Sequence, residues 1–312
     1  MPHPPLTAAR WARGLVTWLV VAAVAASLAF FAGHASVPVR GVSALLPIFG
    51  AVFLVNLAGW VPSTLGRTER YYDLLGSVSH LVAVLSAAAI AGFAPAAIVL
   101  IVPVAVWAGR LGLHLATRAH REGDARFDQI KLDPARFALA WALQSLWTCL
   151  NTLGVLVAVT LAGADPAGPA APPPISGWTA AGLFLWGLGF AVEVTADRQK
   201  LAFRADAANR GRFIQGGLWS WSRHPNYVGE IVLWIGLFVA GVPAYTGAGW
   251  LAALSPLFVY GLLRYGSGVP LLEARADARW GGQPDYEAYK VAVPILWPRP
   301  PRPTAPPPAP PR

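Results

Sequence analysis

Residues 196–230 are the part of this chain whose side-chain types and spacing point most clearly to chemistry. Between two long apolar runs they hold six Lys or Arg residues, one His and three carboxylates. Polar groups beside the hydrocarbon core of a membrane are costly, so a cluster of this density indicates a site rather than a simple connection. A cationic pocket at a membrane surface suits an anionic cofactor, while the lipid phase can deliver an apolar substrate.

The first half of the cluster has helical spacing. Asp197, Lys200 and Arg204 fall at i, i+3 and i+7, so they share one face of a helix. The alternative is a helix beside the membrane whose cations meet lipid phosphates. Asp197 and Glu193 argue against that alternative, because a helix that binds the membrane surface rarely places carboxylates on its lipid-facing turn.

The second half of the cluster predicts the start of a helix. Pro225 disfavours helix at His224 and suits the first turn of the helix that follows. A helix N-terminus next to the guanidinium of Arg223 makes an anion site. Asn226 and Glu230 are four residues apart on one face, and a buried carboxylate needs a donor. A cofactor amide, a basic side chain or a purely structural ion pair with an arginine would each supply it.

A third polar group lies in other loops on the same side. Tyr72 and Asp73 enter one apolar run, and Arg110, His114 and Arg118 leave the next at intervals of four residues, on one helical face. Asp73 could act on a substrate or simply cap its helix, because Asp is favoured in first turns.

The composition is that of an integral membrane protein. Hydrophobic residues make up 55% of the chain and charged residues 12%, compared with about 25% charged residues in soluble domains. The net charge of +9 does not indicate nucleic acid, because the cations cluster in alternate loops, as membrane orientation requires. The single Cys149 excludes an internal disulfide, and the six dispersed His show no i, i+4 pair, so we expect no metal site.

The apolar runs predict an all-α fold, a polytopic bundle of about eight transmembrane helices with a cofactor pocket at its cytoplasmic side. A span needs about 20 mostly apolar residues. The eight predicted spans are 14–32, 41–60, 74–92, 96–113, 137–162, 177–195, 228–244 and 247–266. After the last of them, residues 273–289 form an amphipathic segment with Trp280, Tyr286 and Tyr289 as membrane anchors, which predicts a helix on the membrane surface.

The loop charges predict the orientation. One set of loops carries most of the cations: Arg10, Arg13, Arg67, Arg70, Arg118, Arg121, Arg126, Lys131, Arg136 and those of residues 198–223. The opposite set carries only Arg40, so we expect both termini and the active site in the cytoplasm. Residues 1–35 could instead be a cleaved signal peptide, although a signal core usually has only about 7–15 apolar residues.

The motifs resemble a known family. The run ADRQK-x-x-F-R followed by GLW-x-x-SRHPNYVGE resembles the C-terminal half of the steroid 5-alpha-reductase-like membrane proteins, and more narrowly their bacterial branch. Similar segments continue the resemblance: RYYDLLGS (70–77), WAGRLGLHL (107–115), GDARFD (123–128), FALAWALQSLW (137–147) and residues 267–290. Sterol reductases and isoprenylcysteine carboxyl methyltransferases share RHP-x-Y-x-G. The resemblance predicts an N-terminal two-span segment (1–64), a steroid-reductase-like domain (65–298) and a Pro-rich tail (299–312).

In reductases of this family the cytoplasmic end of the helix bundle encloses NADPH. The chain has no G-x-G-x-x-G after a strand and no Walker loop, so a nucleotide would be held without a Rossmann domain. Carried over position by position, the resemblance implies these cofactor contacts: Asp197, Arg204, Arg223, His224, Asn226, Tyr227 and Glu230. Glu273 and Arg275 occupy the neighbourhood of further cofactor contacts in the steroid enzymes.

The resemblance also implies a catalytic group. Asp73 falls where the steroid enzymes place a glutamate that acts on the substrate carbonyl. The tyrosine that assists this glutamate aligns with Trp107, and a tryptophan is no proton donor of comparable acidity. Tyr72 or His114 would have to take its place.

The reaction implied is NADPH-dependent reduction of an activated C=C bond in a steroid-, isoprenoid- or fatty-acyl-like substrate within the bacterial inner membrane. Hydride reaches the electron-poor carbon while an acid, Asp73, stabilises charge on the conjugated oxygen, worth roughly 100- to 10,000-fold in rate. Lys200, Arg204 and Arg223 would pair with the cofactor phosphates. The apolar substrate would enter laterally from the membrane lipids.

Two other functions remain open. A methyltransferase that uses S-adenosylmethionine on a prenylated or lipid substrate would need less phosphate-directed charge, and here the basic cluster favours the reductase. A non-enzymatic lipid-binding membrane protein with a vestigial site is the other alternative, and Trp107 is the residue that supports it.

Overall fold

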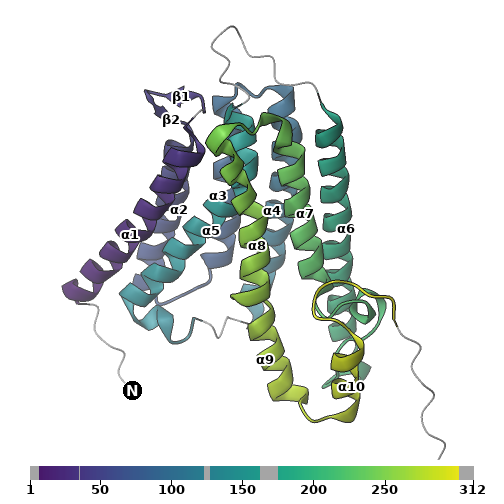
Figure 1. Cartoon of the computed structure of the whole chain (residues 1–312). Coiled ribbons are helices and arrows are strands. Elements are labelled where there is room, and N and C mark those ends of the chain that lie inside the picture. Colours follow the sequence, from purple (N-terminus) through teal and green to yellow (C-terminus); the bar gives the residue numbers. More distant parts are fainter. Residues whose placement is uncertain (1–6, 35, 123–126, 162–174, 302–312) are drawn as a thin grey trace, which may run out of the picture. The chain divides into compact units, whose positions relative to one another are not determined.

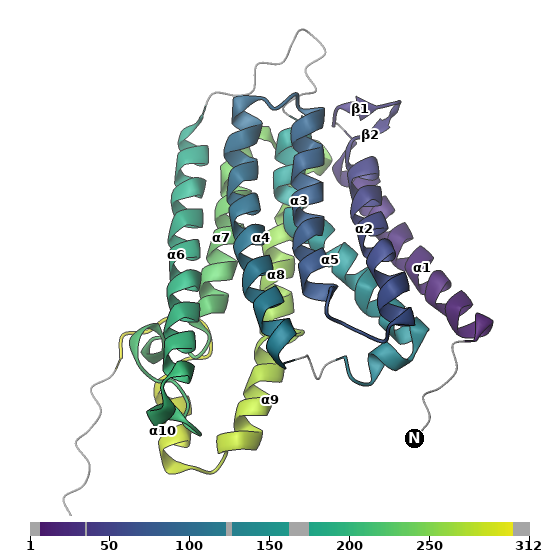
Figure 2. The same cartoon turned by 180° about the vertical axis from the view of Figure 1, so that it is seen from behind.

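The computed structural model describes residues 7–34, 36–122, 127–161 and 175–301, and of residues 114–122 it describes the backbone only. These residues form ten α-helices, five 3-10 helices and one two-stranded ribbon (Figures 1 and 2). The all-α fold predicted from the sequence is confirmed. The chain divides into two compact units. Unit 1 holds residues 1–184 and 235–258, and unit 2 holds residues 185–234 and 259–312. The sequence-based division at residues 64 and 298 stays a prediction.

Unit 1 holds the long N-terminal helices and a small β-ribbon. Its complete elements are α1 (Ala8–Ala32), β1 (Pro38–Val39), β2 (Val42–Ser43), α2 (Leu45–Leu65), α3 (Tyr72–Ile90), α4 (Pro95–Glu122), η1 (Ile130–Leu132), α5 (Pro134–Leu161), η4 (Val242–Ala244) and η5 (Gly247–Ala253). Three helices contribute residues to both units: α6 (Gly177–Ala205), α7 (Pro225–Gly241) and α8 (Leu254–Tyr265). Unit 2 adds η2 (Ala207–Asn209), η3 (Gly217–Ser220), α9 (Val269–Trp280) and α10 (Pro284–Ala292).

Seven helices of the described chain, α1 to α7, are long and apolar enough to cross a membrane. The chain is therefore an integral membrane protein, and α7 begins at Pro225, as predicted. The eighth predicted span, 247–266, is not one helix. It is the seven-residue η5 followed by the 12-residue α8. Pro256 lies in the first turn of α8, where its missing N–H is tolerated.

The helix α5 is the centre of unit 1, because α1, α2 and α3 all pack against it (Figure 2). Buried amides join three of these helices. The Asn56 side-chain N–H donates to Ser79 Oγ (2.8 Å), and the Gln144 side-chain N–H donates to Asn56 Oδ1 and to the Tyr72 carbonyl (both 2.9 Å). Hydrogen bonds of this kind satisfy polar groups away from water and fix the register of α2, α3 and α5.

Within unit 2, α6 and α7 meet backbone to backbone. A Cβ placed on Gly189 would lie 2.5 Å from the Leu233 nitrogen, and one placed on Gly229 would lie 2.5 Å from the Glu193 nitrogen. Only residues without a side chain allow so close an approach, which is a common way for membrane helices to associate. The contact places Glu193 beside the first turns of α7.

The aromatic residues after α8 pack inward. Phe213 contacts Trp280, Tyr286 and Tyr289 at ring-centroid distances of 5.7, 5.1 and 5.4 Å. Trp280 Nε1–H also donates to the Gly211 carbonyl (2.6 Å). Tyr286 is only 3% exposed, so the prediction that it anchors a helix in the membrane surface is wrong. This amphipathic segment forms two helices, α9 and α10, whose aromatic residues pack against Phe213 in the loop after α6.

Replacing Gly189 by alanine should lower the stability of the protein, because the backbones of α6 and α7 would have to separate. Overpacking of this kind costs about 1–3 kcal/mol, measurable as a lower midpoint of thermal unfolding in detergent. Gly187 is the matched control, since a Cβ there meets nothing within 4 Å. An equal loss of stability in Gly187→Ala and Gly189→Ala would contradict the close contact.

Candidate functional site

The Arg223–His224 segment of unit 2 is held in place by the C-terminal strap, which we define as residues 293–299. Three hydrogen bonds join them: Arg223 N–H to the Pro294 carbonyl (2.9 Å), Ser222 Oγ–H to the Ile295 carbonyl (3.3 Å) and Arg299 N–H to the Trp221 carbonyl (3.1 Å). The backbone just before α7 is therefore fixed by a segment about 70 residues downstream.

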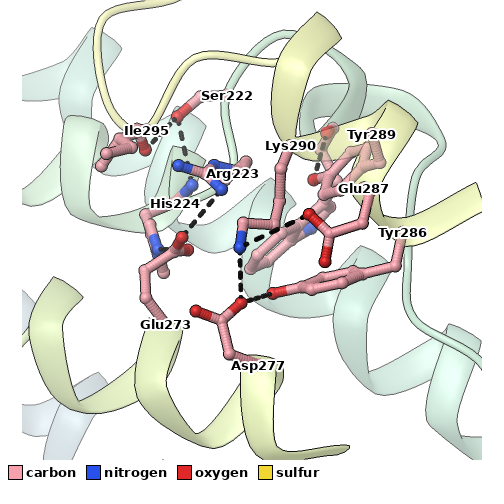
Figure 3. A network of polar contacts seen from close by, with 11 residues as sticks. Ser222, Arg223, His224, Glu273, Asp277, Tyr286, Glu287, Tyr289, Lys290 and Ile295 are labelled. Atoms are coloured by element: carbon pink, nitrogen blue, oxygen red, sulfur yellow. Dashed lines mark hydrogen bonds and ion pairs between the residues drawn. The ribbon is translucent and has the colours of Figure 1, made fainter. Parts of the chain in front are cut away.

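Glu273 of α9 contacts the side chains of Arg223 and His224 at once. Its Oε2 lies 2.8 Å from Arg223 Nη1, and its Oε1 lies 2.8 Å from His224 Nε2 (Figure 3). The Arg223 and His224 side chains are 9% and 6% exposed. A carboxylate that reaches both from another helix compensates the buried guanidinium and orients the imidazole ring.

The protonation of this cluster follows from its burial. Burial lowers the pKa of His224, and the hydrogen bond to Glu273 only partly opposes this effect. Burial would raise the pKa of Glu273, but the His224 hydrogen bond and the Arg223 charge outweigh it and leave the pKa below its usual value. His224 is therefore neutral at pH 7, with Nε2–H donating to Glu273 and with a lone pair on Nδ1.

Several buried polar atoms of this segment have no hydrogen-bond partner within the described ranges. They are Arg223 Nε and Nη1, His224 Nδ1 and Asn226 Oδ1. The contact of Nη1 with Glu273 is thus an ion pair without an aligned hydrogen bond. Buried polar atoms are nearly always paired in folded proteins. Arg223 contributes donors to this set, and His224 and Asn226 contribute acceptors.

The predicted cofactor face of α6 is tied to the loop that follows it. Lys200 Nζ lies 4.6 Å from the centre of the Trp219 ring, and Trp219 Nε1–H donates to the Ala196 carbonyl (3.1 Å). The Leu218 N–H donates to Gln199 Oε1 (2.9 Å). Asp197 and Lys200 are half-buried, whereas Arg204 is exposed.

A second polar network joins α9 to α10. Asp277 Oδ1 accepts from Tyr286 Oη (3.0 Å) and from Lys290 Nζ (2.7 Å), and Tyr289 Oη donates to the Trp219 carbonyl (2.8 Å) (Figure 3). The Lys290 hydrogen bond lowers the pKa of Asp277. These bonds hold α10 against the loop before α7.

Two cavities lined by described residues open on unit 2. One, of about 300 Å³, is lined by Arg223, Lys290, Arg299 and the strap. The other, of about 270 Å³, has Phe203 and Phe213 in its lining. Neither cavity is lined by both Arg204 and Arg223, although the sequence analysis placed these two cations around one ligand. The other predicted cofactor residues, Tyr227 and Glu230, lie half-buried in the first turns of α7, and the Tyr227 ring stacks on His224 (5.5 Å).

The predicted catalytic residues lie in unit 1. Tyr72 Oη donates to the Ala140 carbonyl (3.0 Å), and its ring packs on Trp141 (5.1 Å), so its hydroxyl holds α3 to α5. Asp73 is half-buried in the first turn of α3. His114 lies in α4, and its side chain is outside the described residues. Their catalytic roles stay predictions.

Trp107 is a core residue of unit 1. It is 1% exposed, and its ring contacts those of His80 (5.3 Å) and Trp147 (6.4 Å). His80 is fully buried, with Nδ1 lying 2.8 Å from the Gly76 carbonyl. No role for His80 was predicted, since its signal in the sequence was only that of a titratable group inside an apolar run.

Glu273 is the site residue that sequence reasoning placed least firmly. The resemblance put it only near cofactor contacts, and Asp277 and Lys290 were not singled out. The sequence pointed to Glu273 only indirectly. A buried Arg223 needs a counter-charge, and residues 196–230 offer few carboxylates. Which of the downstream carboxylates meets it depends on how α9 folds back.

Comparison with known proteins yields one family. A family model described as "Protein of unknown function (DUF1295)" matches residues 59–293, about three quarters of the chain. The matched range contains the Arg223–His224 segment and Glu273. No curated protein and no solved structure matches the chain.

Replacing Glu273 by alanine would leave the buried Arg223 without its counter-charge. Breaking a buried pair in this way costs about 3 kcal/mol, which would lower the midpoint of thermal unfolding. Glu287→Ala is the control, because Glu287 is 48% exposed and 3.8 Å from Lys290, and an exposed pair contributes about 0–1 kcal/mol. Similar losses in the two variants would contradict the central role of Glu273.

The lowered pKa of His224 predicts the sign of a pH effect on stability. The unfolded chain binds the His224 proton more tightly than the folded one. The stability that this group contributes is therefore complete above the ordinary His pKa of 6.5 and is lost as the pH falls through the lower folded-state pKa. The unfolding midpoint should fall on acidification below pH 6.5, and it should fall less in His224→Asn. Identical pH profiles of the two proteins would refute this.

Proposed function

The chain belongs to the DUF1295 family, and we propose that it is an NADPH-dependent membrane reductase of an activated C=C bond in a lipid-soluble substrate. The observation that carries the proposal is the set of buried polar atoms without partners at the start of α7, on Arg223, His224 and Asn226. They lie within four consecutive residues, next to a helix N-terminus, where anionic groups are favoured.

These atoms fit a nucleotide cofactor. The Nε–H of Arg223, which has no hydrogen-bond partner among the described residues, suits a phosphate oxygen, which guanidinium groups bind through charge-assisted hydrogen bonds. His224 Nδ1 and Asn226 Oδ1 are acceptors, which suit a carboxamide N–H or a ribose hydroxyl. NADPH, when bound, would supply the hydride. Glu273 contributes by holding His224 in the tautomer that keeps Nδ1 an acceptor.

The cations of α6 add to this site. Lys200 is fixed over Trp219, and Arg204 follows one turn later with an exposed side chain. We propose that both neutralise cofactor phosphates, with Asp197, Tyr227 and Glu230 completing the pocket. The row of cations lies at the end of α6, where the apolar span gives way to polar residues.

For the proton we favour Asp73. Tyr72 already donates its hydroxyl proton to the Ala140 carbonyl, so it is less able to donate to a substrate. Asp73 would hydrogen-bond to the conjugated oxygen of the substrate while the chain excludes water from the reacting carbons. The substrate class is apolar because it must partition into the lipid around the spans.

We further propose that the segment Gly247–Tyr265 crosses the membrane as a broken eighth span. A 3-10 helix rises about 2.0 Å per residue and an α-helix about 1.5 Å, so seven and 12 residues together reach about 30 Å, the thickness of the hydrocarbon core. An even number of spans puts both termini on one side, and the excess of cations makes that side the cytoplasm of a bacterial inner membrane.

One observation favours a second function, S-adenosylmethionine-dependent methyl transfer to a lipid or prenylated substrate. Glu273 compensates the charge of Arg223, so the site is less cationic than the sequence alone indicates and would also accept a cofactor without phosphates. His224 Nδ1 and Asn226 Oδ1 would then accept from an amino group or from ribose.

Binding of the two cofactors separates these functions. Purified protein in detergent should be protected against thermal unfolding by NADPH, and Arg204→Ala should weaken NADPH binding about 10-fold, the loss of one charge-assisted contact. Arg210→Ala is the matched control, an exposed cation six residues away, and should change the affinity less than twofold. Protection by S-adenosylmethionine alone would overturn the reductase in favour of the methyltransferase. Protection by neither would favour the lipid-binding alternative.

A further inference from the structure

The cavity beside Phe203 is lined by none of the residues to which the proposed function gives a role. It measures about 270 Å³ and lies wholly within unit 2, between the end of α6, the loop after it and the start of α10. Its chemically distinctive lining residues are Phe203, Arg212, Phe213, Gln215, Gln283 and Asp285. This lining combines aromatic rings, amides, one guanidinium and one carboxylate, whereas the strap cavity is lined by three cations and otherwise by apolar residues.

Three of these side chains are available to a ligand. Arg212, Gln215 and Gln283 are exposed, and within the part of the chain that the structure describes their side chains make no hydrogen bond or ion pair. Asn209, by contrast, uses its side-chain N–H on the Phe203 carbonyl (3.1 Å). The cavity therefore offers the side-chain amides of Gln215 and Gln283 and the guanidinium of Arg212 to a ligand, whereas the Asn209 amide is already hydrogen-bonded.

The aromatic wall is rigid. Phe213 is fixed by the rings of Trp280, Tyr286 and Tyr289, and Phe203 is part of the continuous helix α6. Both phenylalanines are half-buried, so part of each side chain is open. A flat ring that stacks on such a side chain gains about 1–3 kcal/mol.

This chemistry matches a purine nucleoside better than a simple anion. A glutamine amide can donate to and accept from the N6/N7 edge of adenine at once. A carboxylate suits ribose hydroxyls, and an arginine suits a phosphate on the ribose. Asp285 in the lining would accept a hydrogen bond from a ribose hydroxyl.

The position of the cavity along α6 fits an elongated ligand. Phe203 is ten residues beyond Glu193, about 15 Å along the helix axis, and Glu193 adjoins the first turns of α7 at Gly229. Lys200 and Arg204 lie on the turns between and just beyond. A base at Phe203, phosphates beside the cations and a second ring toward Asn226 would follow the helix in that order.

We propose that the Phe203–Gln283 cavity binds the adenosine end of the cofactor. The proposal rests on the proposed nucleotide-dependent function, but it does not require the reductase, because NADPH and S-adenosylmethionine share adenosine. Arg212 is the group that recognises a phosphate on the adenosine ribose, so it favours NADPH over NADH.

The test uses the full-length protein in detergent, with binding followed by thermal stabilisation and calorimetry. The double variant Gln215→Ala/Gln283→Ala should raise the Kd for NADPH about 5- to 30-fold, the loss of two hydrogen bonds. Binding of reduced nicotinamide mononucleotide, which lacks adenosine, should stay within twofold. Arg212→Ala should weaken NADPH binding and leave NADH binding unchanged, and Arg210→Ala, two residues away and outside the lining, should alter neither.

The outcomes separate this inference from the proposed function. If the wild type binds NADPH and the double variant binds it equally well, the adenosine site is overturned while the reductase stands. If the wild type binds no NADPH, the proposed reductase function is refuted. The adenosine site is then tested on its own, by the binding of S-adenosylmethionine or adenosine 5′-monophosphate. Weaker binding of either by the double variant supports the site, and unchanged or absent binding overturns it.

Discussion

The arrangement of unit 2 depends on one interaction, the contact of the Glu273 carboxylate with both Arg223 and His224. A guanidinium as buried as that of Arg223 is tolerated only with a counter-charge close by, and Glu273 supplies it at 2.8 Å while also holding His224. The same contact fixes α9 against the start of α7. It also sets the hydrogen-bonding character of the segment, since a neutral His224 with its proton on Nε2 leaves Nδ1 as an acceptor.

Two other constraints bring the polar groups into one unit. Gly189 and Gly229 remove the side chains that would keep α6 and α7 apart, so the cations at the end of α6 belong to the same compact unit as the first turns of α7. The strap then closes the backbone before α7 from the other end of the sequence. The proposed nucleotide site would depend on such supports, because it has no glycine-rich loop of the Rossmann kind to hold the phosphates.

The proposed functions share most of their physical basis. A charge-compensated Arg223, two open acceptors and an aromatic cavity with free amides all suit an adenosine-containing cofactor, and the cations of α6 add the preference for phosphates. The residues proposed to act on the substrate lie in unit 1 and have a different environment. In unit 1, Asn56, Ser79 and Gln144 bind one another, and Asp73 is the group there to which we assign chemistry.

The sequence alone determined the helices, since long apolar runs can satisfy their backbone in a membrane only as helices, and it determined the start of α7 through Pro225. It also predicted a site at the Arg223–His224 segment, which stays a prediction. It predicted one helix over 247–266, where the structure has η5 followed by α8, and it wrongly assigned Tyr286 to the membrane surface. Only the tertiary structure decided that Glu273 meets Arg223, that Tyr286 packs on Phe213 and that Gln215 and Gln283 line one cavity. Each of these contacts joins residues far apart in the chain, and their pairing depends on how the helices fold back rather than on local spacing.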